Sequence, residues 1–412
     1  MLAGPVSAPV TVRSEKITDP GSLLELLPEP SAVAWIRGGD GFVGWGQAAR
    51  VEFAGPQRFE RADAWWQAYL SATSVEDEVG IPGSGPLAIA SFSFADEDSS
   101  ASGTSVLVVP RVVVGRRNGV TWRTVVGRPQ PPAPVRAPWH APGARLLEDP
   151  AAVNAWRSAV ACAVQDIRSG DLAKVVLALA MDAEADEPID GRDVLGRLTE
   201  RYPDCWGFLV DGLVGATPEL LVERVGGQVR SRILAGTIPR TGDASDDARL
   251  GATLLASEKD LDEHRLAAGP VAERLAQHCS SLTVPEEPSL LELPNLLHLS
   301  TEMSGRLHGD TTALGLAGDL HPTPAVAGTP SAAALRRIER LETTDRGRYA
   351  GPVGWIDAHG DGEFCLALRC AQLSGASARL FAGCGIVAES DPDSEVAEWR
   401  AKLRPIQDAL LG

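Results

Sequence analysis

The amino-acid sequence predicts an α+β protein in which antiparallel strands build the core and helices flank them. Short apolar runs of strand character, separated by clusters of Gly, Pro, Asp and Ser, occupy residues 1 to about 127. From about residue 149 onward, helical and strand patterns occur in mixed clusters. Such clusters favour a layered α+β fold over a parallel βαβ sheet. Glycine-rich phosphate loops of the GxGxxG or GxxxxGK type do not occur between a strand and a helix.

The N-terminal third carries three strand signals and then a proline-rich segment. The runs "SAVAWIRG", "PLAIASFSF" and "TSVLVVPRVVVG" are rich in apolar residues and are bounded by turn-forming residues. The segment "GRPQPPAPVRAPWHAPGA" follows at 127–144. Because proline favours an extended backbone, we expect this segment to wrap the surface or to join two parts of one domain.

The remaining elements are predicted from periodicity and from capping and turn residues. Helices are predicted at 149–170, 191–204, 257–279 and 393–411, and strand regions at 172–185, 205–240 and 349–390. Within the last region, "HGDGE" has the composition of a hairpin turn.

Composition limits the classes of function. The chain has 412 residues, of which 44% are apolar and 23% charged, as in an ordinary globular protein. An uninterrupted apolar run of about 18 residues is absent, so we expect no membrane span. The opening "MLAGPVSAPVTVRSEK" does not have the pattern of a secretory signal, so a cytoplasmic location is expected.

Charge and cysteine spacing limit the partners. The net charge of −17 repels phosphate backbones, which makes nucleic acid an unfavourable partner but leaves small anionic substrates possible. The six cysteines are scattered without CxxC spacing. We therefore expect reduced thiols and no zinc site.

Two predicted helices begin with pairs of carboxylates. The helix "SEKDLDEHRLAAGPVAERLAQHC" has Ser257 as its expected N-cap and carries Asp260 and Glu263 three residues apart. The last helix carries Glu395 and Glu398 at the same spacing. If the two helix starts converge, four acidic groups crowd together, which is unfavourable without a cation. Oxygen ligands without His or Cys favour Mg²⁺, whereas each helix alone is also explained by the helix dipole.

Several segments, taken together, resemble the chorismate-utilising enzymes (anthranilate synthase component I-like), and within them most closely the isochorismate synthases. These segments occur in one order and end with Lys402. They are "KVVLALA", "GATPELLVE", "LAGTIPR", "SEKDLDEH", "LHPTPAVAGTP", "YAGPVGW", "LALRCAQL" and "LFAGCGIVAESDPDSE". The resemblance covers about 150–410.

The resemblance implies one chorismate-utilising domain over 1–412, built from two large packed antiparallel sheets with flanking helices. A variable strand-rich part would span 1–145 and the motif-bearing catalytic part 146–412. The active site would lie in the central cleft, where both acidic helix starts hold Mg²⁺ against the ring carboxylate of chorismate. By motif position, Glu263 and Glu398 would be the principal ligands, with Asp260 and Glu395 acting through water or as alternates.

The resemblance also implies an isomerase that adds water at ring C2 and expels the C4 hydroxyl of chorismate. Lys174 would be the general base, for which it must be neutral, and Glu219 the general acid, for which it must be protonated. Arg369 would hold the enolpyruvyl carboxylate. The other residues implied around the substrate are Ala235, Gly236, Thr237, His321, Gly383, Gly385 and Lys402. A structural histidine in a proline-rich turn is an equally good interpretation of His321.

Alternatives within the family differ in nucleophile and product. Lys174 favours water over ammonia and argues against anthranilate synthase component I. A salicylate synthase, which goes on to eliminate pyruvate, keeps this lysine and stays open. An inactive chorismate-binding protein would need no acid–base pair. The sequence departs from the family pattern at Ala178, at Leu179 and in "AGTP" at 327–330. We expect a monomer or weak homodimer that serves menaquinone, siderophore or salicylate synthesis.

Overall fold

A computed structural model describes residues 10–96, 104–128 and 143–412. Most of the proline-rich segment at 127–144 lies outside the described residues. The strands are β1 Val10–Lys16, β2 Val33–Arg37, β3 Asp40–Phe53, β4 Thr73–Asp77, β5 Leu87–Ser91, β6 Ser105–Arg117, β7 Val120–Val126, β8 Arg145–Leu147, β9 Lys174–Glu184, β10 Trp206–Val210, β11 Leu213–Thr217, β12 Leu220–Val225, β13 Gln228–Pro239, β14 Cys279–Thr283, β15 Ser289–Glu292, β16 Leu296–Leu307, β17 Gly328–Thr329, β18 Pro352–Asp357, β19 Gly362–Leu366, β20 Cys370–Ser374 and β21 Ser377–Ile386.

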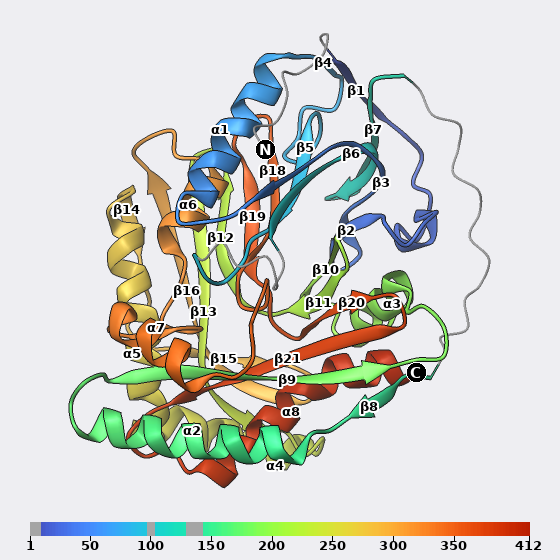
Figure 1. Cartoon of the computed structure of the whole chain (residues 1–412). Helices are drawn as coiled ribbons and strands as arrows, with labels where there is room; N and C mark the ends of the chain where they lie inside the picture. Colours follow the sequence, from blue (N-terminus) through green and yellow to red (C-terminus); the bar gives the residue numbers. More distant parts are fainter. Residues whose placement is uncertain (1–9, 97–103, 129–142) are drawn as a thin grey trace.

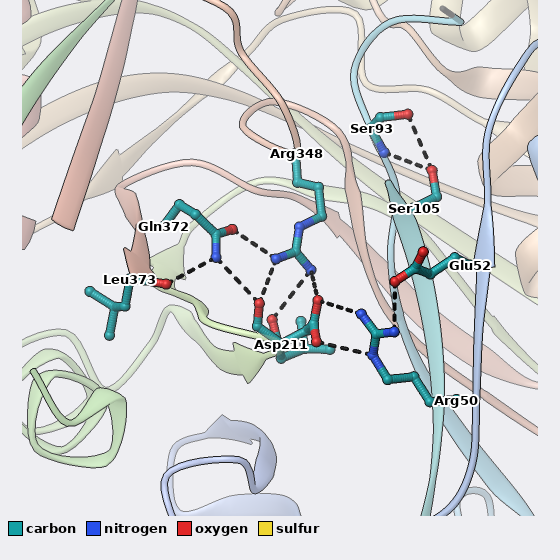
Figure 2. Close-up of polar contacts among 9 residues, drawn as sticks. Arg50, Glu52, Ser93, Ser105, Asp211, Arg348, Gln372 and Leu373 are labelled. Carbon is teal, nitrogen blue, oxygen red and sulfur yellow. Dashed lines mark hydrogen bonds and ion pairs between the residues drawn. The ribbon is translucent and has the colours of Figure 1, made fainter. Parts of the chain in front are cut away.

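The strands pair almost entirely antiparallel, which confirms the predicted fold class. One hydrogen-bonded ladder runs β17–β9–β21–β20–β11–β10–β2–β3–β6–β5–β18–β19–β12–β13–β16. Figure 1 shows that β9 and β21 cross the lower half of the molecule, whereas β12, β13, β16, β18 and β19 run upright. The ladder thus folds into two layers, which the long paired strands β3 and β6 help to connect. Among described strands, only β1 and β4 pair in parallel.

The helices cover the outer sides of these layers (Figure 1). They are α1 Arg58–Ser71, α2 Pro150–Arg168, α3 Gly191–Arg201, α4 Ala244–Ala256, α5 Glu258–Ala276, α6 Ala313–Leu320, α7 Ser331–Leu341 and α8 Pro392–Leu411, with a short 3-10 turn at Leu24–Leu26. Helix α8 packs on β21 and α2, while α5 packs on β13. The buried apolar face of α8, which includes Val396, Trp399, Leu403 and Ile406, fixes it against the sheet.

Both acidic helix starts are capped by side chains, and the cap predicted at Ser257 is confirmed. Ser257 accepts a hydrogen bond from the backbone N–H of Asp260 at the start of α5. Asp391 accepts one from the N–H of Ser394, and Pro392 occupies the first turn of α8. The sequence predictions for α2, α3, α5, α8, β9 and the strand regions are confirmed. Helix α1, which interrupts the region predicted to be strand-rich, was not predicted. No described helix is long and apolar enough to cross a membrane.

Candidate active site

One cavity collects residues from most of the motifs. Its volume is about 60 Å³, or about 620 Å³ when the adjoining open space is included, and it lies between the two sheet layers. Ten of the residues singled out from the sequence line it: Lys174, Glu219, Ala235, Gly236, Thr237, Glu263, Arg369, Gly383, Gly385 and Lys402. They come from β9, β13, α5, β21, α8 and the loops that follow β11 and β19. The fold therefore brings together groups separated by more than two hundred residues.

Lys174, the first residue of β9, forms an ion pair with Glu263 of α5. The Lys174 Nζ lies 3.0 Å from Glu263 Oε1, and the two side chains are 1% and 15% exposed. The positive charges of Lys174, Lys402 and Lys259 lower the pKa of Glu263 despite its burial. Glu263 is therefore a carboxylate at neutral pH, as a metal ligand must be.

Gly385 makes room for this ion pair. A Cβ atom at this position would lie 2.3 Å from Glu263 Oε1 and 2.9 Å from Lys174 Cε. Both distances are shorter than a non-bonded contact allows, so any side chain here would displace one partner. The glycine is thus explained by close packing of the lysine and the glutamate beneath the cavity.

Glu219 has the environment of a carboxylic acid that keeps its proton. It lies in the turn between β11 and β12, is 3% exposed, and its Oε1 has no hydrogen-bond partner among the described residues. Burial raises the pKa of Glu219 to about 7, although a backbone hydrogen bond from Leu234 and the charge of Lys174 oppose the rise. At neutral pH a large fraction of this side chain is protonated and able to donate.

Arg369 offers unpaired donors to the cavity. Its Nε is buried without a hydrogen-bond partner among the described residues, and its Nη2 lies 3.5 Å from His298 Nε2. Its φ of 50° is in the left-handed region, as is the φ of 62° of Ala350, which also lines the cavity. Backbone strain of this kind collects at functional sites. A planar guanidinium with free donors suits a bound carboxylate.

His298 holds this arginine and was not singled out from the sequence. Burial and the charges of Arg369 and Lys402 lower the pKa of His298 far below its usual value, so the ring is neutral. Because the guanidinium only donates, Nε2 accepts, and Nδ1 then donates to Thr237 Oγ1 at 2.9 Å. Tyr349 and Arg346 also line the cavity. "YAGPVGW" contains Tyr349, but nothing in "LLHLS" marked His298.

The bulge at 235–237 forms another part of the cavity wall. The register of β13 against β16 shifts between Ala235 and Thr237, and Gly236 takes a φ of 78°. The carbonyl of Ala235 accepts a hydrogen bond from His264 Nδ1 of α5 at 3.0 Å. Burial lowers the pKa of His264, so this ring is neutral as well. Helix α5 and the bulge are therefore joined by a hydrogen bond.

His321 lies outside the residues that line the cavity. Its Nε2 donates to the Phe94 carbonyl at 2.9 Å, and its ring packs against Phe59 and Phe94. Burial lowers the pKa of His321 to about 3, so the ring stays neutral. The geometry fits the structural interpretation of this histidine rather than contact with a substrate ring.

The carboxylates of α5 and α8 lie within electrostatic reach of one another. Burial raises the pKa of Asp260, and the charges of Glu263 and Glu398 add to the rise. Burial followed by the charge of Glu398 raises the pKa of Glu395. Lys402 Nζ lies 2.5 Å from a Glu398 oxygen and donates to the Gly383 carbonyl. Glu395 Oε2 is buried without a partner among the described residues. Among the described residues, donor atoms of Glu395, Glu398 and Cys384 lie within 4.8 Å of one another, whereas no such group includes Asp260 or Glu263. The two glutamates of α8, with their orphaned oxygen, fit a divalent cation.

The fold and this cavity define an enzyme that binds a small anionic molecule beside clustered carboxylates. The sequence pattern of the family described as "Chorismate binding enzyme" matches residues 33–136 and 136–411. The chain therefore belongs to the chorismate binding enzymes.

Three similar proteins of this family are all described as isochorismate synthases. The chain is 34% identical over 402 residues, 90% of this chain and 82% of the relative, to the salicylate biosynthesis isochorismate synthase of Pseudomonas aeruginosa. It is 43% identical over 256 residues to isochorismate synthase DhbC of Bacillus subtilis, covering 59% and 64% of the two chains. The structure of DhbC from Bacillus anthracis superposes with a TM-score of 0.79 at 32% identity, covering 94% and 98%.

Proposed function

We propose that this chain converts chorismate into isochorismate in the cavity between the two sheet layers, with Mg²⁺ as its cation. The observation that carries the proposal is the pairing of two proton-transfer groups around one cavity. Lys174 and Glu219 are both at least 97% buried, yet both line it. Isomerisation of chorismate needs a base for the incoming water and an acid for the departing hydroxyl.

Arg369 binds the substrate. Its free donors bind both oxygens of the enolpyruvyl carboxylate, and His298 accepts from another guanidinium nitrogen and keeps the group in place. Thr237 holds the histidine tautomer that makes this possible. The pocket thereby fixes which face of the ring meets each catalytic group.

Lys174 acts as the base and Glu219 as the acid. Lys174 must first give the proton of its ion pair with Glu263 to solvent. Its neutral amine then takes a proton from water while the water oxygen bonds to ring C2. The ring double bonds shift, the C4–O bond breaks, and Glu219 gives its proton to the departing hydroxyl, which leaves as water. One water enters and one leaves, so the product is an isomer of the substrate. Proton transfer back through solvent restores both groups.

Four side chains would hold the cation. Glu263 and Glu398 are the proposed principal ligands, and Asp260 and Glu395 the proposed outer or alternate ones. When bound, Mg²⁺ would neutralise the ring carboxylate and draw negative charge from the ring. Lys174 and a cation compete for the same Glu263 carboxylate, because that side chain already pairs with the amine.

The test is product analysis after purified protein is incubated with chorismate and Mg²⁺. Isochorismate as the sole product supports the proposal. Salicylate with pyruvate would assign the chain to the salicylate synthases instead. Anthranilate formed only with added ammonia would assign it to the amino-transferring branch. Absence of turnover would make it a chorismate-binding protein without activity.

A further inference from the structure

Cys384 faces away from the substrate cavity and toward the start of α8. Its neighbours Gly383 and Gly385 line the cavity, and alternation along β21 turns the cysteine to the opposite side. There its Sγ lies 3.4 Å from the Glu395 carbonyl. The Sγ and one carboxylate oxygen each of Glu395 and Glu398 all lie within 4.8 Å of one another. One thiol and two carboxylates thus share one buried corner.

The side chain of Glu395 also indicates a ligand at this corner. Glu395 is only 5% exposed, and Ser390 Oγ donates a hydrogen bond to its Oε1 at 2.7 Å. Its Oε2 has no partner among the described residues. An orphaned, buried carboxylate oxygen is costly unless a cation or donor satisfies it. The serine also prevents the carboxylate from turning freely, so the unpaired oxygen is held in place.

The donor set is softer than the one that Mg²⁺ prefers. Mg²⁺ favours oxygen ligands in octahedral geometry, whereas thiolate sulfur selects metals such as Zn²⁺. Tetrahedral zinc takes sulfur at about 2.3 Å and carboxylate oxygen at about 2.0–2.2 Å. Such bonds put neighbouring donors roughly 3.3–3.8 Å apart. The present donors lie within 4.8 Å of one another, so the cluster contracts when a metal binds.

We propose that Cys384, Glu395 and Glu398 form a second, thiophilic cation site that takes Zn²⁺ or Cd²⁺ and overlaps the Mg²⁺ site at Glu398. Binding forms a sulfur–metal bond and releases the thiol proton to solvent. Water completes the coordination. The cysteine spacing gave no sign of this site, because two of its donors come from the helix that follows.

The shared glutamate makes the two cations compete. Glu398 now pairs with Lys402 at 2.5 Å, and a metal bound to the thiol would draw this carboxylate toward α8. The Mg²⁺ site would then lose one of its two principal ligands. Zn²⁺ or Cd²⁺ is therefore inhibitory in proportion to its occupancy of the thiol site, and excess Mg²⁺ opposes it.

The first experiment titrates Cd²⁺ into the full chain and follows the ultraviolet charge-transfer band of the cadmium–thiolate bond. The exposed Cys162 and half-buried Cys279 are replaced by alanine in the background, since both are accessible thiols. We expect one saturable band per chain in this background. Adding Cys384→Ser, which preserves size and keeps an oxygen, should abolish the band and weaken Cd²⁺ at least about tenfold. A band that persists in Cys384→Ser would overturn the proposal.

The second experiment adds Mg²⁺ to the cadmium-loaded background variant without chorismate. The band should fall as Mg²⁺ rises, because Glu398 cannot serve both ions fully. A band that stays constant at saturating Mg²⁺ would refute the overlap. Neither experiment depends on turnover. The cadmium titration can therefore refute the thiol site without refuting the proposed isomerase activity, and product analysis can refute the activity without refuting the thiol site.

Discussion

Lys174 Nζ lies 3.0 Å from Glu263 Oε1, so the candidate base and a candidate metal ligand form one buried ion pair. The pair joins the first residue of β9 to the second turn of α5, and Gly385 of β21 supplies the space it needs. Proton transfer and cation binding are therefore coupled through one carboxylate. Removing the amine should therefore stop proton transfer and at the same time free the Glu263 carboxylate for a cation.

Lys174→Ala should abolish isochorismate formation while the protein still folds. Loss of a general base costs about 10²–10⁴ in rate. The measurement is kcat with chorismate and Mg²⁺, accompanied by thermal unfolding. Lys16→Ala, an exposed lysine on β1, is the matched control and should keep near-normal turnover. Near-normal kcat in Lys174→Ala would refute its role as base.

The same Lys174→Ala variant should bind divalent cations at least as tightly as the unmodified protein. Removing the amine frees the Glu263 carboxylate from its ion-pair partner. Calorimetric titration with Mg²⁺ measures the effect without substrate. Weaker Mg²⁺ binding in the variant would mean that the lysine supports the cation site rather than competing with it.

Activity that depends on Glu219 should fall as pH rises through about 7. Burial raises the pKa of this carboxyl to about 7, and the acid must carry its proton before turnover. Above that pH its protonated fraction, and with it kcat/KM, should drop about tenfold per pH unit. Glu219→Gln should lose about 10²–10⁴ in kcat and also this alkaline limb, whereas exposed Glu187→Gln should keep both. A limb that survives in Glu219→Gln belongs to another group.

Arg369→Lys should raise KM for chorismate more than it lowers kcat. Lysine keeps the charge but loses the planar fork and the contact with His298. Hydrogen bonds to a charged group are worth about 1.5–3 kcal/mol, which corresponds to roughly 10–100-fold in KM. Steady-state kinetics separates the two constants. An unchanged KM would show that Arg369 does not bind the substrate carboxylate.

Gly385→Ala should leave stability nearly unchanged and still abolish turnover. The new Cβ meets the ends of the Glu263 and Lys174 side chains, which can move at small cost to folding. Displacing them breaks the geometry on which both proposed functions of the pair depend. Gly196→Ala on α3, where nothing lies within 4 Å, is the control and should leave kcat unchanged. Its Tm should rise slightly, because alanine favours the helix more than glycine does. Wild-type kcat in Gly385→Ala would contradict this explanation of the glycine.

Local signals predicted the elements that have strong caps and periodicity. Asp149 caps α2, and Ser257 and Asp391 cap the acidic helices, as their sequences indicate. Helix α1 was not predicted, because it begins without a side-chain cap. Residues of α6 are apolar on nearly every side, so helical periodicity is weak there.

The site was predictable where motifs mark it and not where pairing between distant strands creates it. Lys174, Glu219 and Arg369 sit in recognisable segments, and all line the cavity. His298 faces the cavity only because β16 pairs with the bulged β13, a register that a single sequence does not reveal. The ion pair of Lys174 with Glu263 likewise arises from the packing of β9, β21 and α5.

Measuring how many divalent cations bind per chain, and how tightly, decides whether the two helix starts form one metal site. Mn²⁺, a paramagnetic substitute for Mg²⁺, is titrated into the protein and into Glu263→Gln and Glu398→Gln, with free Mn²⁺ followed by electron paramagnetic resonance. One ion per chain is expected, and each substitution should weaken it at least about tenfold, because the two helix starts contribute to one site. Binding that survives either substitution unchanged would show that residues 263 and 398 do not share a metal.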